Sequence, residues 1–123
     1  MKNKRLKVEV ADTPAKHQHG LMYREKLDQD AGMLFKFNKP QNLKFWGLNT
    51  YIPLSIAFVS PEGQIKKISH ISPLNSLDVV TSDADCDRAI EANYDFFREN
   101  NIWVGDVIDI VDDQDETFVI FNS

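Results

Sequence analysis

Hydrophobic and polar residues alternate along several short stretches of the chain, with apolar side chains at every second position. This period of two is typical of β-strands that are buried on one face. Short apolar runs bounded by turn residues are also typical of strands. The segments with one of these patterns are residues 6–10, 32–37, 43–46, 55–60, 64–69, 77–80, 89–92, 107–111 and 117–121. The chain is therefore predicted to contain about seven to nine short strands.

Turn residues between these segments indicate how the strands are connected. Residues 61–63 read Pro-Glu-Gly, which suits a tight turn and predicts a hairpin between the flanking strands. The acidic segment at residues 112–115 predicts a C-terminal hairpin over residues 107–121. The Asn-Lys-Pro sequence at residues 38–40 is expected to close one strand before the next begins.

Two short helices are predicted from their end signals. Asp12-Thr13-Pro14 places a polar cap residue before a proline at the first helical position, and the helix is expected to extend to about residue 23. Asn93 is expected to cap a second helix that ends at residues 100–101. Many short strands with regular turns favour a mainly β fold, a compact and mostly antiparallel β-barrel or sandwich with two short helices.

Length and composition narrow the class of protein. The chain has 123 residues, 42% of them hydrophobic, which is enough for one autonomous core, and no repeat or linker divides it. We therefore expect a single domain over residues 1–123. No apolar stretch approaches the ~18 residues of a membrane-spanning helix. No apolar segment follows the basic first five residues, so we expect no signal peptide and a cytoplasmic location.

Charge and cysteine content exclude further classes. The net charge is −5, and no cluster of Lys or Arg lies beyond the first seven residues, so nucleic acid is not an expected partner. One cysteine excludes an internal disulfide and a cysteine-rich zinc site. Acidic neighbours raise the pKa of a thiol, so Cys86 is expected to be a buried bystander between two aspartates.

Candidate metal sites fail on spacing. Asp83, Asp85 and Asp87 alternate like the first ligands of a calcium loop. The loop glycine and the final glutamate are missing, so a solvated acidic loop is the better interpretation. His17 and His19 are two residues apart and do not share a helix face. No metal and no cofactor are predicted.

Catalytic motifs are also absent from the sequence. There is no nucleophile elbow, phosphate-binding loop or dinucleotide fingerprint. A hydrolase built on Ser55 would need a base that the sequence does not reveal. His70 stands alone at the end of a predicted strand. The most unusual segment is residues 45–54, Phe-Trp-Gly-Leu-Asn-Thr-Tyr-Ile-Pro-Leu. It is either a structural crossing between strands or the aromatic wall of a pocket with a few polar groups.

Several sequence blocks resemble one known family in the same order. The blocks are residues 8–14, 20–24, 32–35, 45–54, 57–59, Glu91 and residues 104–106. Over about residues 6–108 the chain resembles the bacterial and archaeal domain-of-unknown-function family 192 (DUF 192). The resemblance implies a compact, mainly β, barrel-like domain and no established biochemical activity. Many members look exported. The family usually has lysine where this chain has Leu48, and an acidic residue where it has Ser55.

The leading functional hypothesis is a small module that binds a small molecule or peptide. Its candidate site residues are Arg24, Trp46, Asn49, Thr50 and Glu91. Arg24 would bind an anion through its guanidinium group, with Glu91 as its counter-charge. One alternative is an enzyme that uses Glu91 as acid and base, with Asn49 as a polar stabiliser. Another is a structural or accessory protein without a pocket. The sequence decides neither the ligand nor the oligomeric state.

Overall fold

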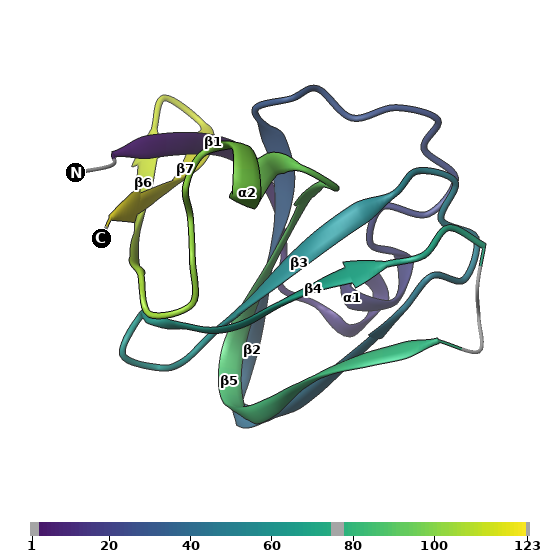
Figure 1. Ribbon diagram of the computed structural model, residues 1–123, viewed down its shortest axis with the longest axis horizontal. Helices are drawn as coiled ribbons and strands as arrows, with labels where there is room; N and C mark the ends of the chain where they lie inside the picture. Colours follow the sequence, from purple (N-terminus) through teal and green to yellow (C-terminus); the bar gives the residue numbers. More distant parts are fainter. Residues whose placement is uncertain (1–2, 75–77, 123) are drawn as a thin grey trace.

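The computed structural model describes residues 3–74 and 78–122. In this part of the chain, seven strands form one sheet that curls into a half-barrel (Figure 1). The strands are β1 (Lys4–Ala11), β2 (Ala31–Trp46), β3 (Leu54–Val59), β4 (Ile65–Ile71), β5 (Val79–Asn93), β6 (Val107–Asp113) and β7 (Glu116–Asn122). Two short helices, α1 (Pro14–His19) and α2 (Phe96–Glu99), complete it. The predicted mainly β class is confirmed.

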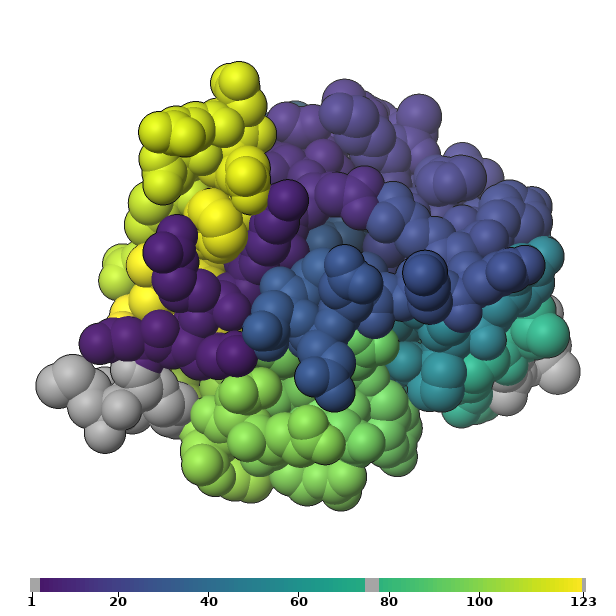
Figure 2. Space-filling view, turned by 90° about the horizontal axis from the view of Figure 1, so that it is seen from above, coloured from purple at the N-terminus to yellow at the C-terminus, as the bar shows by residue number. Residues whose placement is uncertain are grey.

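The order of the strands across the sheet is β4-β3-β5-β2-β1-β7-β6. Only β1 and β2 pair in parallel among the described strands, and the other pairs are antiparallel. Both predicted hairpins are present, as β3–β4 and β6–β7. Because β1 pairs with β7, the two ends of the chain lie side by side, purple against yellow in Figure 2.

Two strands are much longer than the sequence pattern predicts. β2 continues through residues 38–40, which were expected to end it, because register shifts against β5 absorb the extra residues. β5 likewise joins residues 79–80 to 89–92, whereas Leu77 lies outside the described residues. The aspartates at 83, 85 and 87 therefore lie within β5 and not in a loop, although Asp83 and Asp85 are solvent-exposed as expected.

Both helices differ from their predicted limits. Thr13 caps α1 as predicted, its Oγ1 accepting from the amide of Lys16 at 3.2 Å. The helix ends at His19, well before residue 23, because Gly20 adopts a positive φ of 50°. Asp95, not Asn93, precedes α2. Asn93 is the last residue of β5, and its side-chain amide donates hydrogen bonds to the carbonyl oxygens of Leu27 and Asp28.

The buried side chains form two clusters on opposite faces of the long strands. One cluster packs against α2 and the C-terminal hairpin and includes Ile90 and Ala92. The other includes Met33, Phe35 and Ile56 and lies under α1. This second cluster forms the floor of the site described below. Within the described residues, neither helix is long enough to cross a membrane.

Candidate functional site

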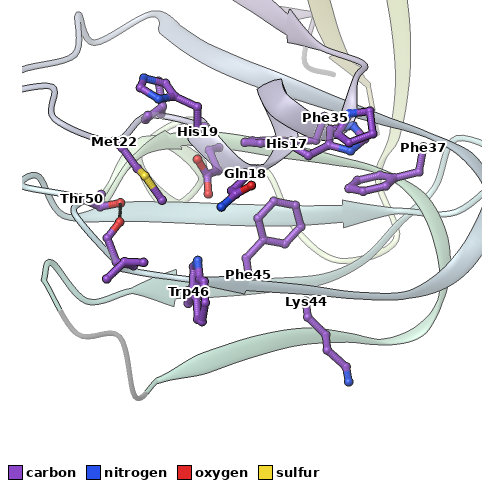
Figure 3. Close-up of a pocket in the computed structure, with 15 residues that line it drawn as sticks. His17, Gln18, His19, Met22, Phe35, Phe37, Lys44, Phe45, Trp46 and Thr50 are labelled. Carbon is purple, nitrogen blue, oxygen red and sulfur yellow. Dashed lines mark hydrogen bonds between the residues drawn. The ribbon is translucent and has the colours of Figure 1, made fainter.

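A cavity of about 430 Å³ opens between α1, the end of β2 and residues 47–53, the crossing segment that joins β2 to β3 (Figure 3). Its volume falls in the range of small-molecule sites. The side chains that reach it from α1 and the following turn are those of His17, Gln18, His19, Leu21 and Met22. Aromatic side chains of β2 form another wall, and Glu91 of β5 lines the cavity as well.

Glu91 is buried although it is a carboxylic acid, with only 5% of its surface exposed. Its neighbours in the sheet are Met33 on β2 and Ile56 on β3. No described residue forms a hydrogen bond or an ion pair with the carboxyl group. Its oxygen atoms are nevertheless not completely buried, and Glu91 lines the cavity, so the carboxyl group faces the cavity. Removal from water disfavours the charged form and raises the pKa of Glu91 to about 8.

The position of Glu91 follows from the alternation of side chains along β5. Ile90 and Ala92 enter the cluster on the α2 side, so Ala89 and Glu91 point to the opposite face. β2 lies so close to β5 at this point that a Cβ atom on Gly32 would stand 2.2 Å from the carbonyl oxygen of Glu91. Glycine at position 32 therefore allows β2 to pair this closely with β5 beside Glu91.

Helix α1 is held over β2 by His17. Its Nε2–H donates to the carbonyl oxygen of Lys36 at 2.7 Å, and its ring stacks on Phe37 with centroids 4.1 Å apart. The end of the helix lies so close to Phe35 that a Cβ atom on Gly20 would stand 3.4 Å from the Phe35 ring. His17 and His19 were expected to be exposed polar residues; His19 is exposed and His17 is half-buried, and both also line the cavity. Gly20 directly after His19 was the only sequence signal for this close approach.

The aromatic wall is built from the second half of β2. Phe45 packs edge-on against Phe35, with centroids 4.9 Å apart. Trp46 ends the strand and remains 48% exposed, so it borders the cavity without being part of the core. In Figure 3, Gln18 extends toward Phe45 and Trp46, and the side chain of Lys44 points away from them. The cavity thus combines aromatic and aliphatic walls with several polar side chains, among them Gln18 and Glu91.

The structure brings three of the five predicted site residues together. Trp46, Thr50 and Glu91 line the same cavity. Thr50 is buried, and its hydroxyl donates to the carbonyl oxygen of Leu48 at 3.4 Å (Figure 3). The hydroxyl proton of Thr50 is therefore used in a hydrogen bond within the crossing segment.

Arg24 does not line this cavity and is not the counter-charge of Glu91. Its guanidinium group donates two hydrogen bonds to the carboxylate of Glu9, one of them from Nη2 to Oε1 at 2.7 Å. The hydrogen bond from Arg24 lowers the pKa of Glu9, and the same bond raises the pKa of Arg24. This pair ties the segment after α1 to β1, which is a structural function.

Asn49 also lies outside the cavity lining. It adopts a left-handed conformation, with φ of 54°, that asparagine tolerates better than most residues. Its carbonyl oxygen accepts from the amide of Tyr23 at 2.8 Å, and its side-chain amide donates to the Tyr23 hydroxyl at 2.9 Å. Asn49 thus joins the crossing segment to the segment after α1.

Leu48 and Ser55, the two departures from the family pattern, lie in different places. Leu48 lines the cavity, whereas Ser55 lies in a separate hollow of about 240 Å³ beside Trp103. The Ser55 hydroxyl donates to the carbonyl oxygen of Tyr94 at 2.5 Å and lies 2.8 Å from His70 Nδ1. With its proton committed to Tyr94, the hydroxyl accepts from His70, which is the wrong direction for a serine nucleophile.

Other candidate groups remain apart from the cavity. Cys86 is a buried free thiol, as predicted, and burial raises its pKa. Asp83 is paired with Lys67 at 2.6 Å and with the hydroxyl of Thr81 at 2.6 Å. Over residues 3–74 and 78–122, no group of three or more His, Cys, Asp or Glu side chains is arranged to hold a metal ion.

Comparison with known families identifies the chain. The model of DUF192, a family described as uncharacterized ACR, matches residues 1–110. The chain belongs to this family. Among curated proteins, none matches it. The family match covers β1 to β5, so all the cavity elements of this DUF192 protein lie inside the matched region.

Two solved structures share the fold. One is the crystal structure of a candidate transcription regulator from Sinorhizobium meliloti 1021, which is 32% identical, with a TM-score of 0.79 over 83% of this chain and 79% of that chain. The other is a protein of unknown function from Novosphingobium aromaticivorans DSM 12444, 31% identical, with a TM-score of 0.78 over 81% of this chain and 71% of that one. Both are similar to this chain in its half-barrel.

Proposed function

We propose that this DUF192 protein binds a small organic molecule in the cavity between α1 and β2. The observation that carries the proposal is Glu91, a carboxylic acid with 5% exposure and no partner among the described residues, which faces that cavity. Burying a polar group without a hydrogen bond is costly. A ligand that pairs with Glu91 would offset this cost.

The rest of the cavity fits the same function. Binding sites for small molecules are mostly apolar, with a few placed polar groups that fix the orientation of the ligand. Here Phe45 and Trp46 offer aromatic surface, and Gln18 reaches between the walls (Figure 3). An aromatic residue that is half exposed at the border of a cavity gains buried area when a ligand covers it.

A fragment screen with a matched pair of tryptophan variants tests the proposal. Small organic fragments are added to the 15N-labelled protein, and binding is followed by NMR through the amide and indole signals. We expect perturbations at Trp46 and along α1, and their loss in Trp46→Ala. Trp103 is similarly exposed, at 53%, but lies outside this cavity, so Trp103→Ala is expected to retain binding. A library of charged and neutral fragments that perturbs none of these signals would contradict the proposal.

Catalysis with Glu91 as acid and base is a second candidate, favoured by one observation. Its pKa of about 8 lies near neutral pH, where a group that both donates and accepts a proton works best. Turnover of a bound fragment that is lost in Glu91→Gln, while the fragment still binds, would support catalysis. Binding without turnover would leave the cavity as a binding site.

A further inference from the structure

The cavity contains an acidic group without a counter-charge. Arg24 is committed to Glu9, and the side chain of Lys44 points away from the aromatic wall (Figure 3). Position 48, on the cavity wall, is occupied by leucine. No described residue forms an ion pair with the carboxyl group of Glu91, although Lys44, His17 and His19 line the same cavity.

We infer that the cavity selects a ligand that carries one protonated amine on a compact aromatic or apolar body, with the amine bound to Glu91. This inference rests on the proposed function. An ammonium group would pair with the carboxylate and donate to both of its oxygens. The body of the ligand would lie against Phe45 and Trp46, whose ring faces attract cations and cover apolar surface.

The two other charge classes fit the cavity less well. An anionic ligand would be repelled by Glu91 in its ionised form, and Arg24, which could have offset that repulsion, is engaged by Glu9. A neutral ligand can accept a hydrogen bond from the protonated acid only, so its affinity should fall as Glu91 ionises, whereas that of an amine should rise. A cation satisfies the group in its ionised form, and breaking such a buried pair is costly.

This ligand class has a characteristic dependence on pH. Glu91 is mostly protonated at pH 7, since its pKa is about 8, so an amine must displace a proton to bind. Affinity for the amine should therefore rise between pH 6 and pH 8. The other titratable groups that line the cavity are His17 and His19 from α1 and Lys44 from β2, and β3 contributes none. Glu91→Gln leaves these three groups in place, so it separates the contribution of Glu91 from theirs.

Three probes of similar size test the inference: benzylamine, benzyl alcohol and benzoate. Titration calorimetry and NMR are used at pH 6, 7 and 8. We expect benzylamine to bind at least about tenfold more tightly than benzyl alcohol at pH 8, and Glu91→Gln to remove that advantage. Benzylamine affinity should rise at least about tenfold from pH 6 to pH 8. Calorimetry at pH 7 in two buffers of different ionisation enthalpy should show the release of about one proton.

The variants distinguish this inference from the broader proposal. The pH dependence of benzylamine affinity should disappear in Glu91→Gln, which leaves both histidines in place. If benzyl alcohol or benzoate binds as tightly as benzylamine, or if the pH dependence persists in Glu91→Gln, the inference is overturned while ligand binding stands. If no probe or fragment of any class binds, both fail.

A tethered amine provides a test that needs no added ligand. Leu48→Lys places an ammonium group on the cavity wall, with Leu48→Met as the control of similar size. We expect the titration of the Glu91 carboxyl carbon, followed by 13C NMR, to move to lower pH in Leu48→Lys and not in Leu48→Met. We also expect weaker benzylamine binding in Leu48→Lys. An unchanged Glu91 titration in a folded Leu48→Lys variant counts against an amine site.

Discussion

Gly32 lies so close to Glu91 that a Cβ atom on it would stand 2.2 Å from the Glu91 carbonyl oxygen and 3.0 Å from Leu6. Real Cβ atoms do not approach a backbone atom this closely, so β2 and β5 can pair at this point only because residue 32 has no side chain. The same pairing of β2 with β5 places Met33 directly beside Glu91. The packing of these two strands therefore matters both for folding and for the position of Glu91.

Gly32→Ala should destabilise the protein strongly. The added methyl group must push β2 away from β5 or displace Leu6, and we expect a loss of about 3 kcal/mol or more in the free energy of unfolding. Urea denaturation measures it. Gly105→Ala is the control, because its Cβ meets nothing within 4 Å and only its φ of +100° is unfavourable. A loss of less than about 1 kcal/mol in Gly32→Ala would show that β2 can shift freely.

Glu91 should make the protein less stable as pH rises. In the unfolded chain its pKa returns to about 4.5, whereas in the folded protein it is about 8. Between these values the folded state holds a proton that the unfolded state has lost, so the free energy of unfolding falls with increasing pH, by about 1 kcal/mol per pH unit. Below pH 4.5 and above pH 8 the contribution of this group is flat.

Glu91→Gln isolates this effect, because glutamine has the same shape and does not titrate. Thermal or urea unfolding of both proteins between pH 5 and pH 8 gives the difference. We expect wild type to lose stability relative to Glu91→Gln across this range. Other acidic groups, such as Glu9 with its lowered pKa, are common to both proteins. Parallel stability curves would mean that Glu91 ionises normally.

Asn49 should act through its backbone conformation and its contact with Tyr23. Asn49→Ala forces alanine into a left-handed conformation and removes the hydrogen bond to the Tyr23 hydroxyl, so we expect a loss of about 1–2 kcal/mol. Asn49→Gly keeps the conformation accessible and should lose less. Tyr23→Phe removes the side-chain bond alone. Equal stability of Asn49→Ala and wild type, by urea denaturation, would contradict this interpretation.

Arg24 should contribute modestly to stability and nothing to ligand binding. Its carboxylate partner Glu9 is 55% exposed, and Arg24 is 35% exposed, so solvent screens the pair. A double-mutant cycle with Arg24→Ala and Glu9→Ala should give a coupling of about 0.5–1 kcal/mol. Any fragment that binds the cavity should bind Arg24→Ala as well as wild type. Weaker fragment binding by Arg24→Ala would mean that Arg24 does belong to the binding site.

The local pattern predicted the strands and both hairpins, because the alternation of side chains is set within a few residues. It failed where pairing between distant strands decides the outcome. β2 runs through Pro40 since β5 shifts register against it, and β5 takes up the aspartates for the same reason. Helix α1 ends early because Gly20 must turn the chain against Phe35.

The candidate site was predicted in part. Trp46 and Thr50 are near each other in the sequence, so one unusual segment pointed to both. His17 and His19 were not predicted as site residues, because residues two apart in a helix do not share a face. Both line the cavity because it surrounds the end of the short helix α1. Arg24 was misplaced because Glu9, fifteen residues away, competes for it.

Local periodicity and residue types were enough to predict the mainly β class, the hairpins, the family resemblance and the aromatic segment at residues 45–54. The packing of distant strands was needed to learn that Glu91 lies beside that segment and that Arg24 does not neutralise it. The same packing raises the pKa of the Glu91 carboxyl group to about 8. A pKa depends on the loss of water and on the charges that surround a group, and both come from strands that are distant in the chain.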